Sequence, residues 1–428
     1  MQLLFRAAKI YDRESEYNGQ TKDILVKDGV IAAIGDHLSC DEAVVYQYEG
    51  MNVSPGWFDL RVASRDPGFE HKEDLPSVKR VAARGGFTAL LLLPNSEPVV
   101  HSKDTIRYLK SAGEQGVVAL HVAGAVTRKA EGIDFTEMMD LHQAGAVAFT
   151  DGVQAIQNPD LLLKTLLYLM PLDTLLINRP EDGSLALYGQ MHEGITSTSI
   201  GLKGIPSLAE EMMVIRDLKL LAYALENRNE HPSGPLLHFS LISTAESVEL
   251  IRDAKSKGLP VSCDIAAHQL AFLDEDMVGF DTNLKVSPPF RSSRDREALR
   301  QGLLDGTIDA IVSDHSPQDE ESKNLEFDHA EFGMIGLETT FSTALKYGGL
   351  ALEDLVDKLS RRPRQILRMP VAGIGEGMEA NLTFFDDQSA WIYDRTLSKS
   401  KNSPFLGKQL QGRVLGVLNR GQIEWFEK

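Results

Sequence analysis

Cysteine is scarce in this chain of 428 residues, which contains only Cys40 and Cys263. Two cysteines cannot make a disulfide framework, and they are typical of a protein in a reducing cytosol. Basic residues are also few: 44 Lys+Arg stand against 62 Asp+Glu, so the formal net charge is −18. Because nucleic-acid binding needs clustered Lys and Arg, this balance argues against a nucleic-acid partner.

Long hydrophobic runs are absent as well. Apolar stretches such as residues 89–94 and 166–172 fall far short of the ~20 residues that a membrane helix requires. The N-terminal residues lack the basic segment and the apolar segment of a signal peptide. We therefore expect a cytoplasmic protein without a membrane partner.

The chain is longer than the ~250–300 residues at which a single core stops growing, which predicts one large domain plus a smaller one. Strand-like segments gather at both ends. Asp28-Gly29 separates two apolar runs as a hairpin turn would, and Asn419-Arg-Gly421 does the same near the C-terminus. We expect residues 1–53 and 366–428 to pair into one small β-sandwich, with residues 398–404 as an exposed loop.

The centre, residues 54–365, alternates strand and helix. This regular alternation over about 300 residues predicts a parallel sheet and favours a closed (β/α)8 TIM barrel. An open doubly wound sheet is the weaker alternative, because no Gly-rich phosphate loop follows the first strand. The expected strands are 88–93, 117–122, 146–149, 174–177, 236–241, 261–265 and 310–312, with helices that include 77–84, 135–144, 208–225, 243–257 and 294–304.

In a barrel of this kind the active groups lie on loops at the C-terminal ends of the strands. Polar motifs occupy those positions in order: residues 55–68, Pro94-Asn95, 149–152, 178–182, 241–247, Ala267-His268, 287–291 and 313–318, followed by Phe332-Gly-Met-Ile-Gly-Leu-Glu338. The order and spacing of these motifs resemble those of the dihydroorotases of the amidohydrolase superfamily over nearly the full chain. The resemblance implies an amidohydrolase-type barrel, hydrolysis of a cyclic amide in pyrimidine biosynthesis, a zinc cofactor and a homodimer.

The zinc ligands are where this chain departs from the family. Four positions that hold zinc-binding histidines in dihydroorotases are occupied by Arg61, Ala63, Arg179 and Leu241. Two carboxylates remain: Asp314, which matches the family's general base, and Asp151, which matches a bridging ligand less securely. A guanidinium has no lone pair to donate, and two carboxylates alone do not hold zinc tightly. We therefore expect no metal and no hydrolysis, because zinc is what activates the attacking water.

Removing a dication would leave buried carboxylates without a counter-charge, which is costly. We therefore expect Arg61 or Arg179 to pair with Asp314 or Asp151.

The substrate-binding positions are only partly retained. The resemblance implies that Arg65, Asn95 and His268 hold a substrate carboxylate, and Phe332-Gly333 match the family's backbone contacts. Two further contacts differ: Ser287 replaces an asparagine and Gln318 replaces a histidine. Structural retention of the matching residues, with packing roles alone, is the alternative interpretation. His238 is not expected to rescue the metal site, and His315 and Asp59 are expected to anchor loops.

Three functions follow. The favoured hypothesis is a non-catalytic structural or regulatory homologue, with aspartate transcarbamoylase as partner by analogy with relatives that have degenerate metal sites. The second is an active cyclic amidohydrolase with an altered or absent metal, in which Arg61 or Arg179 stabilises the oxyanion. The third is a metal-free sensor of dihydroorotate, orotate or another ureido acid.

Overall fold

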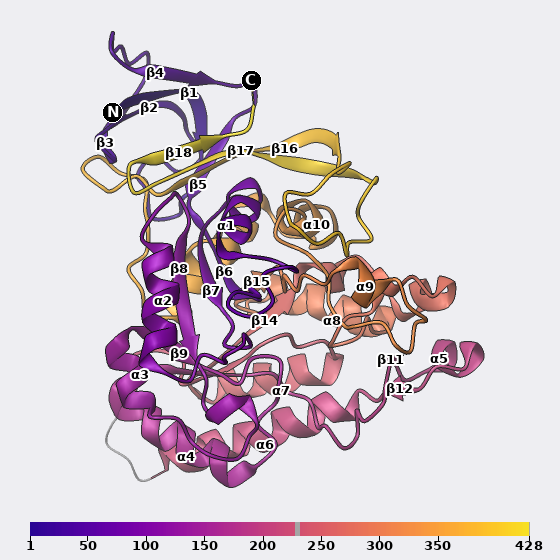
Figure 1. Ribbon diagram of the computed structural model, residues 1–428. Helices are drawn as coiled ribbons and strands as arrows, with labels where there is room; N and C mark the ends of the chain where they lie inside the picture. The colour runs from indigo at the N-terminus through magenta and orange to yellow at the C-terminus, as the bar shows by residue number, and fades with distance from the viewer. Residues whose placement is uncertain (227–231, 428) are drawn as a thin grey trace.

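A parallel barrel and a terminal β-sheet make up the protein (Figure 1). The computed structural model describes residues 1–226 and 232–427. The strands are β1 (Gln2–Ile10), β2 (Thr21–Lys27), β3 (Val30–Gly35), β4 (Val44–Gln47), β5 (Asn52–Pro55), β6 (Trp57–Val62), β7 (Phe87–Leu92), β8 (Ala119–Gly124), β9 (Ala146–Phe149), β10 (Leu175–Asn178), β11 (Met191–His192), β12 (Gly204–Ile205), β13 (Leu237–Phe239), β14 (Val261–Ala266), β15 (Ala310–Val312), β16 (Leu382–Ile392), β17 (Gln409–Asn419) and β18 (Gln422–Trp425). The α-helices are α1 (Leu75–Arg84), α2 (Lys103–Gly113), α3 (Met138–Ala144), α4 (Pro159–Leu169), α5 (Ile195–Ile200), α6 (Leu208–Leu225), α7 (Ala245–Ser256), α8 (Ser293–Leu304), α9 (Glu320–Lys323), α10 (Thr340–Tyr347), α11 (Leu352–Leu359) and α12 (Arg361–Ile366).

Eight parallel strands form the barrel in the order β15-β14-β13-β10-β9-β8-β7-β6. Most are buried on both faces, as expected of parallel strands covered by helices. The two ends of this sheet meet where Val62 and His315 form a parallel bridge and Ala63 N donates to His315 O at 2.9 Å. The prediction of a (β/α)8 barrel is therefore confirmed.

Side-chain caps mark where the barrel helices begin. Asp74, Ser102, Asn158 and Thr244 each accept a hydrogen bond from a backbone N–H in the first turn of α1, α2, α4 and α7. Hydrophobic periodicity had not singled out α2 or α4. Their capping residues, Ser102 and the Asn158-Pro159 pair, are the signals that would have found them.

The two termini build one eight-stranded sheet, with order β18-β17-β16-β5-β1-β2-β3 and β4 paired to β1. The N-terminal and C-terminal segments join where β5 pairs antiparallel with β16. Both expected hairpin turns are present, with positive φ at Asp28 and Gly29 (49° and 81°) and at Arg420 and Gly421 (52° and 68°). The prediction that the chain ends form one β unit is confirmed.

An arm, residues 186–205, projects from the barrel and carries β11, α5 and β12 (Figure 1). The pair β11–β12 is parallel, with Met191 opposite Gly204. None of the helices in the described part of the chain is long and apolar enough to cross a membrane.

Candidate functional site

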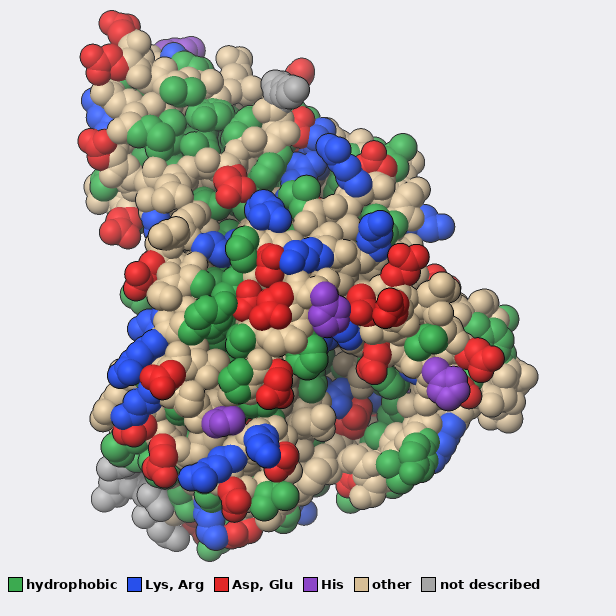
Figure 2. All heavy atoms as spheres, in the orientation of Figure 1, with side chains coloured by type: hydrophobic (Ala, Val, Ile, Leu, Met, Phe, Trp, Pro, Cys, Tyr) green, Lys and Arg blue, Asp and Glu red, His purple; other side chains and the backbone are tan. Residues whose placement is uncertain are grey.

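A polar cavity of about 510 Å³ opens at the C-terminal ends of the barrel strands, with the arm as one wall. Figure 2 shows the molecule hollowed between the barrel body and the projecting arm. The lining of this cavity includes three guanidiniums and three carboxylates: Arg61, Arg65, Arg179, Glu181, Asp314 and Glu331. The charges of this cavity therefore depend on which acid pairs with which arginine.

Arg61 pairs with Asp314 in the floor of the cavity. The Arg61 side chain, at the end of β6, is 3% exposed, and its Nε donates to Asp314 Oδ1 at 3.0 Å. Burial raises the pKa of Asp314, and the charge and hydrogen bond of Arg61 act against that rise. The predicted ion pair between a replacement arginine and a remaining carboxylate is thus present.

Arg179 has a different partner from the expected ones. Its Nη2 lies 2.5 Å from Glu181 Oε1, and its Nη1 donates to Ser287 Oγ at 2.6 Å. The Ser287 hydroxyl in turn donates to Glu181 Oε2 at 3.2 Å. Sequence reasoning missed Glu181, although it lies in the same strand-end motif, residues 178–182.

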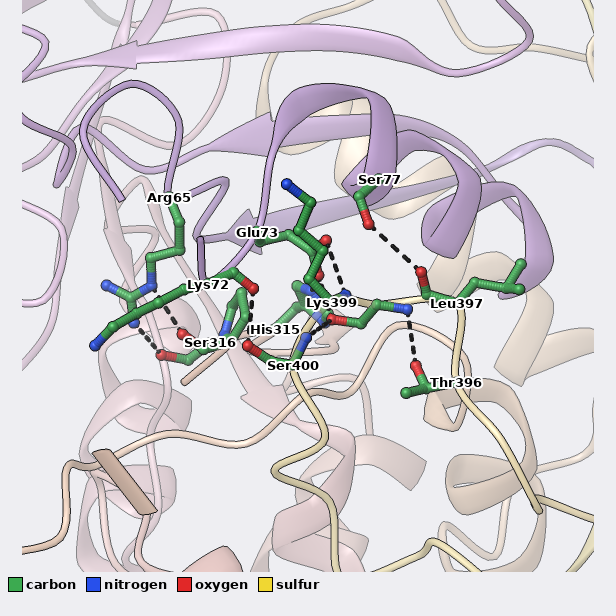
Figure 3. Close-up of polar contacts among 12 residues, drawn as sticks. Arg65, Lys72, Glu73, Ser77, His315, Ser316, Thr396, Leu397, Lys399 and Ser400 are labelled. Carbon is green, nitrogen blue, oxygen red and sulfur yellow. Dashed lines mark hydrogen bonds and ion pairs between the residues drawn. The ribbon is translucent and has the colours of Figure 1, made fainter. Parts of the chain in front are cut away.

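Arg65 also lines the cavity, and no carboxylate among the described residues forms an ion pair with its guanidinium. Its Nε donates to the Pro317 carbonyl at 3.1 Å and its Nη2 to Ser316 Oγ at 2.9 Å (Figure 3). Burial lowers the pKa of Arg65, and the nearby Glu331 and Asp314 act against this. A guanidinium that donates only to neutral oxygens keeps its positive charge available for an anionic ligand.

The structure does not bring the other two members of the expected carboxylate clamp to the cavity wall beside Arg65. Asn95 Nδ2 donates to the Asp151 carbonyl at 3.1 Å, and Asn95 Oδ1 accepts from Val153 N at 3.0 Å. His268 is buried with its ring edge-on to Phe290, and burial lowers the pKa of His268 to about 3. A neutral, enclosed imidazole is placed for packing.

Gln318, Phe332 and Gly333 do line the cavity. Gln318 is held in the wall, because its Oε1 accepts from Lys72 Nζ at 2.7 Å and its Nε2 donates to the Phe332 carbonyl at 2.8 Å. Both ends of this side chain are therefore engaged within the protein.

Among the residues that the structure describes, Asp151 has no arginine partner. Its carboxylate accepts from Thr127 N at 2.9 Å and from Thr127 Oγ1 at 2.6 Å. Burial raises the pKa of Asp151, and these two hydrogen bonds act against the rise. The ion pair expected for this carboxylate is replaced by a neutral loop contact.

The donor set at the former ligand positions does not fit zinc. Ala63 and Leu241 carry no donor atom, the two arginines carry no lone pair, and Asp314 already binds a guanidinium. A catalytic zinc site needs three protein ligands of the N, O or S type. Within residues 1–226 and 232–427, no three His, Cys, Asp or Glu side chains gather in a way that could hold a metal ion.

A strap from the C-terminal segment, residues 396–403, crosses the loops around the barrel mouth. It overlaps residues 398–404, which were expected to be an exposed loop. Lys399 and Lys401 are exposed, but Ser398, Ser400 and Asn402 are buried, so the expectation is wrong for these three residues. Ser398 donates to Glu73 and Ser400 donates to the Lys72 carbonyl (Figure 3). The alternation of small polar side chains in this segment is the signal that could have shown an inward-facing edge.

Glu73 and His315 lie beneath the strap, both fully buried, with His315 Nε2 3.5 Å from Glu73 Oε2. Bonds from the strap and His315 lower the pKa of Glu73 against the effect of burial. His315 Nδ1 accepts from Gly336 N at 3.3 Å, so this side chain anchors a loop as expected.

Arg291 anchors the arm to the barrel. Its Nη1 donates to the Ile205 carbonyl at 2.9 Å and contacts His192 Nδ1 at 3.2 Å, and its Nε donates to Ser243 Oγ at 3.0 Å. The buried Glu210 carboxylate accepts from Ser243 N at 2.8 Å and lies 3.7 Å from Arg291. Two strand-end motifs therefore hold this wall of the cavity in place.

Comparison with known proteins agrees with this architecture. A family model described as dihydro-orotase-like matches residues 50–247. A dihydroorotase from Pelotomaculum thermopropionicum is 39% identical over 99% of this chain and 98% of that protein. A dihydroorotase from Syntrophus aciditrophicus is 38% identical over 100% of both chains.

Among solved structures, an L-hydantoinase from Arthrobacter aurescens has a TM-score of 0.83 at 24% identity, covering 100% of this chain and 97% of that chain. A dihydropyrimidinase from Brevibacillus agri has a TM-score of 0.81 at 20% identity, with 99% and 95% covered. These two likenesses show the shared fold. With full-length relatives near 38% identity, the chain belongs to the dihydroorotase family.

Proposed function

We propose that this member of the dihydroorotase family does not carry out zinc-dependent hydrolysis and is retained as a structural or regulatory homologue in pyrimidine biosynthesis. The observation that carries the proposal is the buried Arg61–Asp314 pair, with Nε and Oδ1 3.0 Å apart. Asp314 is the position of the family's general base. The Arg61 guanidinium occupies Oδ1 of this carboxylate and opposes the rise in pKa that burial causes, so it works against Asp314 as a proton acceptor.

An active amidohydrolase with another electrophile is the less supported alternative. Oxyanion stabilisation would need a donor free to point at the reacting carbonyl. Arg61 and Arg179 are instead neutralised by Asp314 and Glu181, respectively. Neither guanidinium is left with an uncompensated charge for the reaction.

Dihydroorotate ring opening tests the proposal. The purified protein is assayed with and without added zinc, beside Asp314→Ala and beside an active dihydroorotase as positive control. We expect no activity above the Asp314→Ala background and less than one tightly bound zinc per chain by elemental analysis. Zinc-dependent turnover that is lost in Asp314→Ala would overturn the proposal.

We propose that a homodimer of this chain binds aspartate transcarbamoylase in the cytoplasm. The proposal is supported by analogy with relatives that have degenerate metal sites. Size-exclusion chromatography with light scattering compares the two proteins mixed and separate at micromolar concentration. A co-eluting complex is expected, and unchanged elution of both proteins would count against this partner.

A second function, binding of a ureido acid without turnover, is favoured by Arg65. Its guanidinium lines the cavity and donates only to neutral oxygens. Calorimetric titration with orotate tests this reading, with Arg65→Gln as the variant and Arg107→Gln, on the exposed face of α2, as the matched control. Binding that Arg65→Gln abolishes and Arg107→Gln preserves would support a sensor, and no heat with any of the three proteins would support a scaffold.

A further inference from the structure

A second pocket, of about 470 Å³, lies between the strap and the loop that carries α9. We call it the outer pocket. It is lined only by polar and charged residues. It shares Gln318 with the wall of the cavity of about 510 Å³ at the C-terminal ends of the barrel strands, which we call the mouth cavity. Nothing in the dihydroorotase chemistry discussed above uses it.

Lys323, at the end of α9, is the buried charge of the outer pocket, with 6% of its surface exposed. Two of its N–H groups donate to backbone carbonyls, of Glu331 at 2.8 Å and of Gly333 at 3.1 Å. An ammonium has three donors, so one remains after these two. The structure gives Lys323 no carboxylate within ion-pair distance among the described residues.

A second buried lysine reinforces this charge. Lys285 Nζ donates to the carbonyls of Phe327 and Asp328 at 2.7 and 3.2 Å, and it likewise has no carboxylate partner among residues that the structure describes. Burial and the neighbouring Lys285 lower the pKa of Lys323 to about 7, while Asp281 and Glu331 act in the opposite direction. Lys323 thus feels the charge of a second buried lysine, and neither lysine has a carboxylate partner among the described residues.

Some of the other charged side chains that line the outer pocket already have partners. Asp319 caps α9 through Ser322 N at 2.9 Å and lies 3.4 Å from His71. Lys399 pairs with Asp74 at 2.5 Å. Lys401 and Glu320, both exposed, have no side-chain partner in the described part of the chain, and the same holds for the amides of Asn283 and Asn324.

We propose that the outer pocket binds a small oxyanion, a phosphate or a carboxylate group, between Lys323 and Lys401, with the amides of Asn283 and Asn324 as further hydrogen-bond donors. The anion supplies the counter-charge that Lys323 lacks, and it takes the third N–H of Lys323. This site is separate from the mouth cavity and does not depend on the function proposed for that cavity.

An anion bound in the outer pocket would affect the mouth cavity through the contacts of Lys323. Lys323 donates to the Gly333 carbonyl, which also accepts from Asn402 Nδ2 at 3.1 Å, and Gly333 lines the mouth cavity. A ligand that stabilises the Lys323 ammonium therefore also stabilises the loop that forms part of the mouth.

Calorimetric titration tests the site with two probes, inorganic phosphate and succinate, on the full chain at about pH 6.5. We expect one binding event, weakened at least tenfold in Lys323→Met and several-fold in Lys401→Met. Lys219→Met, an exposed lysine on α6, serves as the control and should bind as the unmodified protein does. Binding of phosphate alone identifies a phosphate group as the natural source, and binding of succinate alone identifies a carboxylate.

The titration is repeated at about pH 8, where most of a lysine with a pKa near 7 is neutral. Affinity for succinate should fall several-fold, because succinate keeps its charge over this interval. No binding of either probe, or equal binding by all variants, would overturn the proposal. Lys401→Met keeps the test decisive if Lys323→Met does not fold, because Lys401 is exposed.

Discussion

At the scale of single residues, the Arg61–Asp314 pair joins the two edge strands of the barrel sheet, because Arg61 lies one residue before the end of β6 and Asp314 follows β15. Both side chains are almost fully enclosed. Taking two charges out of water is costly, and their attraction compensates only while both are present. Each partner therefore depends on the other far more than in a surface pair.

We expect Arg61→Met and Asp314→Asn each to lower the free energy of unfolding by about 3–5 kcal/mol, because each leaves one buried charge unpaired. The double variant should lose much less than the sum of the two, and urea denaturation measures all three. Arg107→Met, which breaks an exposed pair with Asp104 at 3.3 Å, should change stability by less than about 1 kcal/mol. Strictly additive losses at the buried pair would show that the two charges do not compensate each other.

Asp59 gives a prediction on pH. Its carboxylate accepts from Arg61 N and Ser313 N, each at 2.9 Å, but burial raises the pKa of Asp59 to about 7. Between about pH 4 and about pH 7 the carboxyl of Asp59 is therefore protonated in the folded protein and ionised in the unfolded chain. The free energy of unfolding should fall as the pH rises from about 4 to about 7.

Asp59→Asn cannot lose that proton. The difference in free energy of unfolding between the unmodified protein and Asp59→Asn, measured by urea denaturation across this range, should therefore shift against the unmodified protein as the pH rises. Parallel curves for the two proteins would mean that Asp59 stays ionised in the folded state.

At the scale of elements, the strap connects parts of the chain that are far apart in sequence. Asn402 Nδ2 donates to the Ser316 and Gly333 carbonyls at 3.0 and 3.1 Å, and Asn402 Oδ1 accepts from Gln318 N at 3.1 Å. The terminal sheet thus contributes side chains to the mouth of the barrel.

Asn402→Ala should lower the free energy of unfolding by about 1–3 kcal/mol, because it leaves buried backbone groups without partners. Hydrogen exchange at Gln318 and Gly333 should also speed up, which mass spectrometry of peptic peptides measures. Thr396→Ala is the matched control on the same strap, since it loses a contact to Glu338 and none to Gln318 or Gly333. Equal protection of the 316–333 segment in both variants would mean that the strap does not hold the mouth.

At the scale of the whole molecule, the donor set at the barrel mouth predicts a stability that does not depend on a metal. A ligand that binds the folded state stabilises it by mass action, and its removal lowers the melting temperature. We expect excess EDTA, followed by dialysis, to shift the melting temperature by less than about 1 °C. A fall of several degrees that added zinc reverses would reveal a structural zinc site and contradict this expectation.

Sequence alone determined the barrel, the pairing of the chain ends and the two hairpin turns, because strand alternation, Asp28-Gly29 and Asn419-Arg-Gly421 express local backbone preferences. It also determined that Arg61, Ala63, Arg179 and Leu241, at the positions where the family resemblance implies zinc ligands, cannot bind zinc, since donor chemistry belongs to the side chain. Sequence did not determine which acid pairs with which arginine. Arg179 meets Glu181 of its own loop, and Asp151 meets Thr127 from the end of the neighbouring strand, whereas closure of the barrel between β6 and β15 brings Arg61 to Asp314.

The buried strap was likewise decided by tertiary structure. Its serines and asparagine are polar, which predicts exposure, yet Ser398 and Ser400 find partners 325 and 328 residues away at Glu73 and Lys72, and Asn402 finds Gly333, 69 residues away. A polar side chain can be buried only where a hydrogen-bond partner is available to it, and only the folded chain supplies that partner.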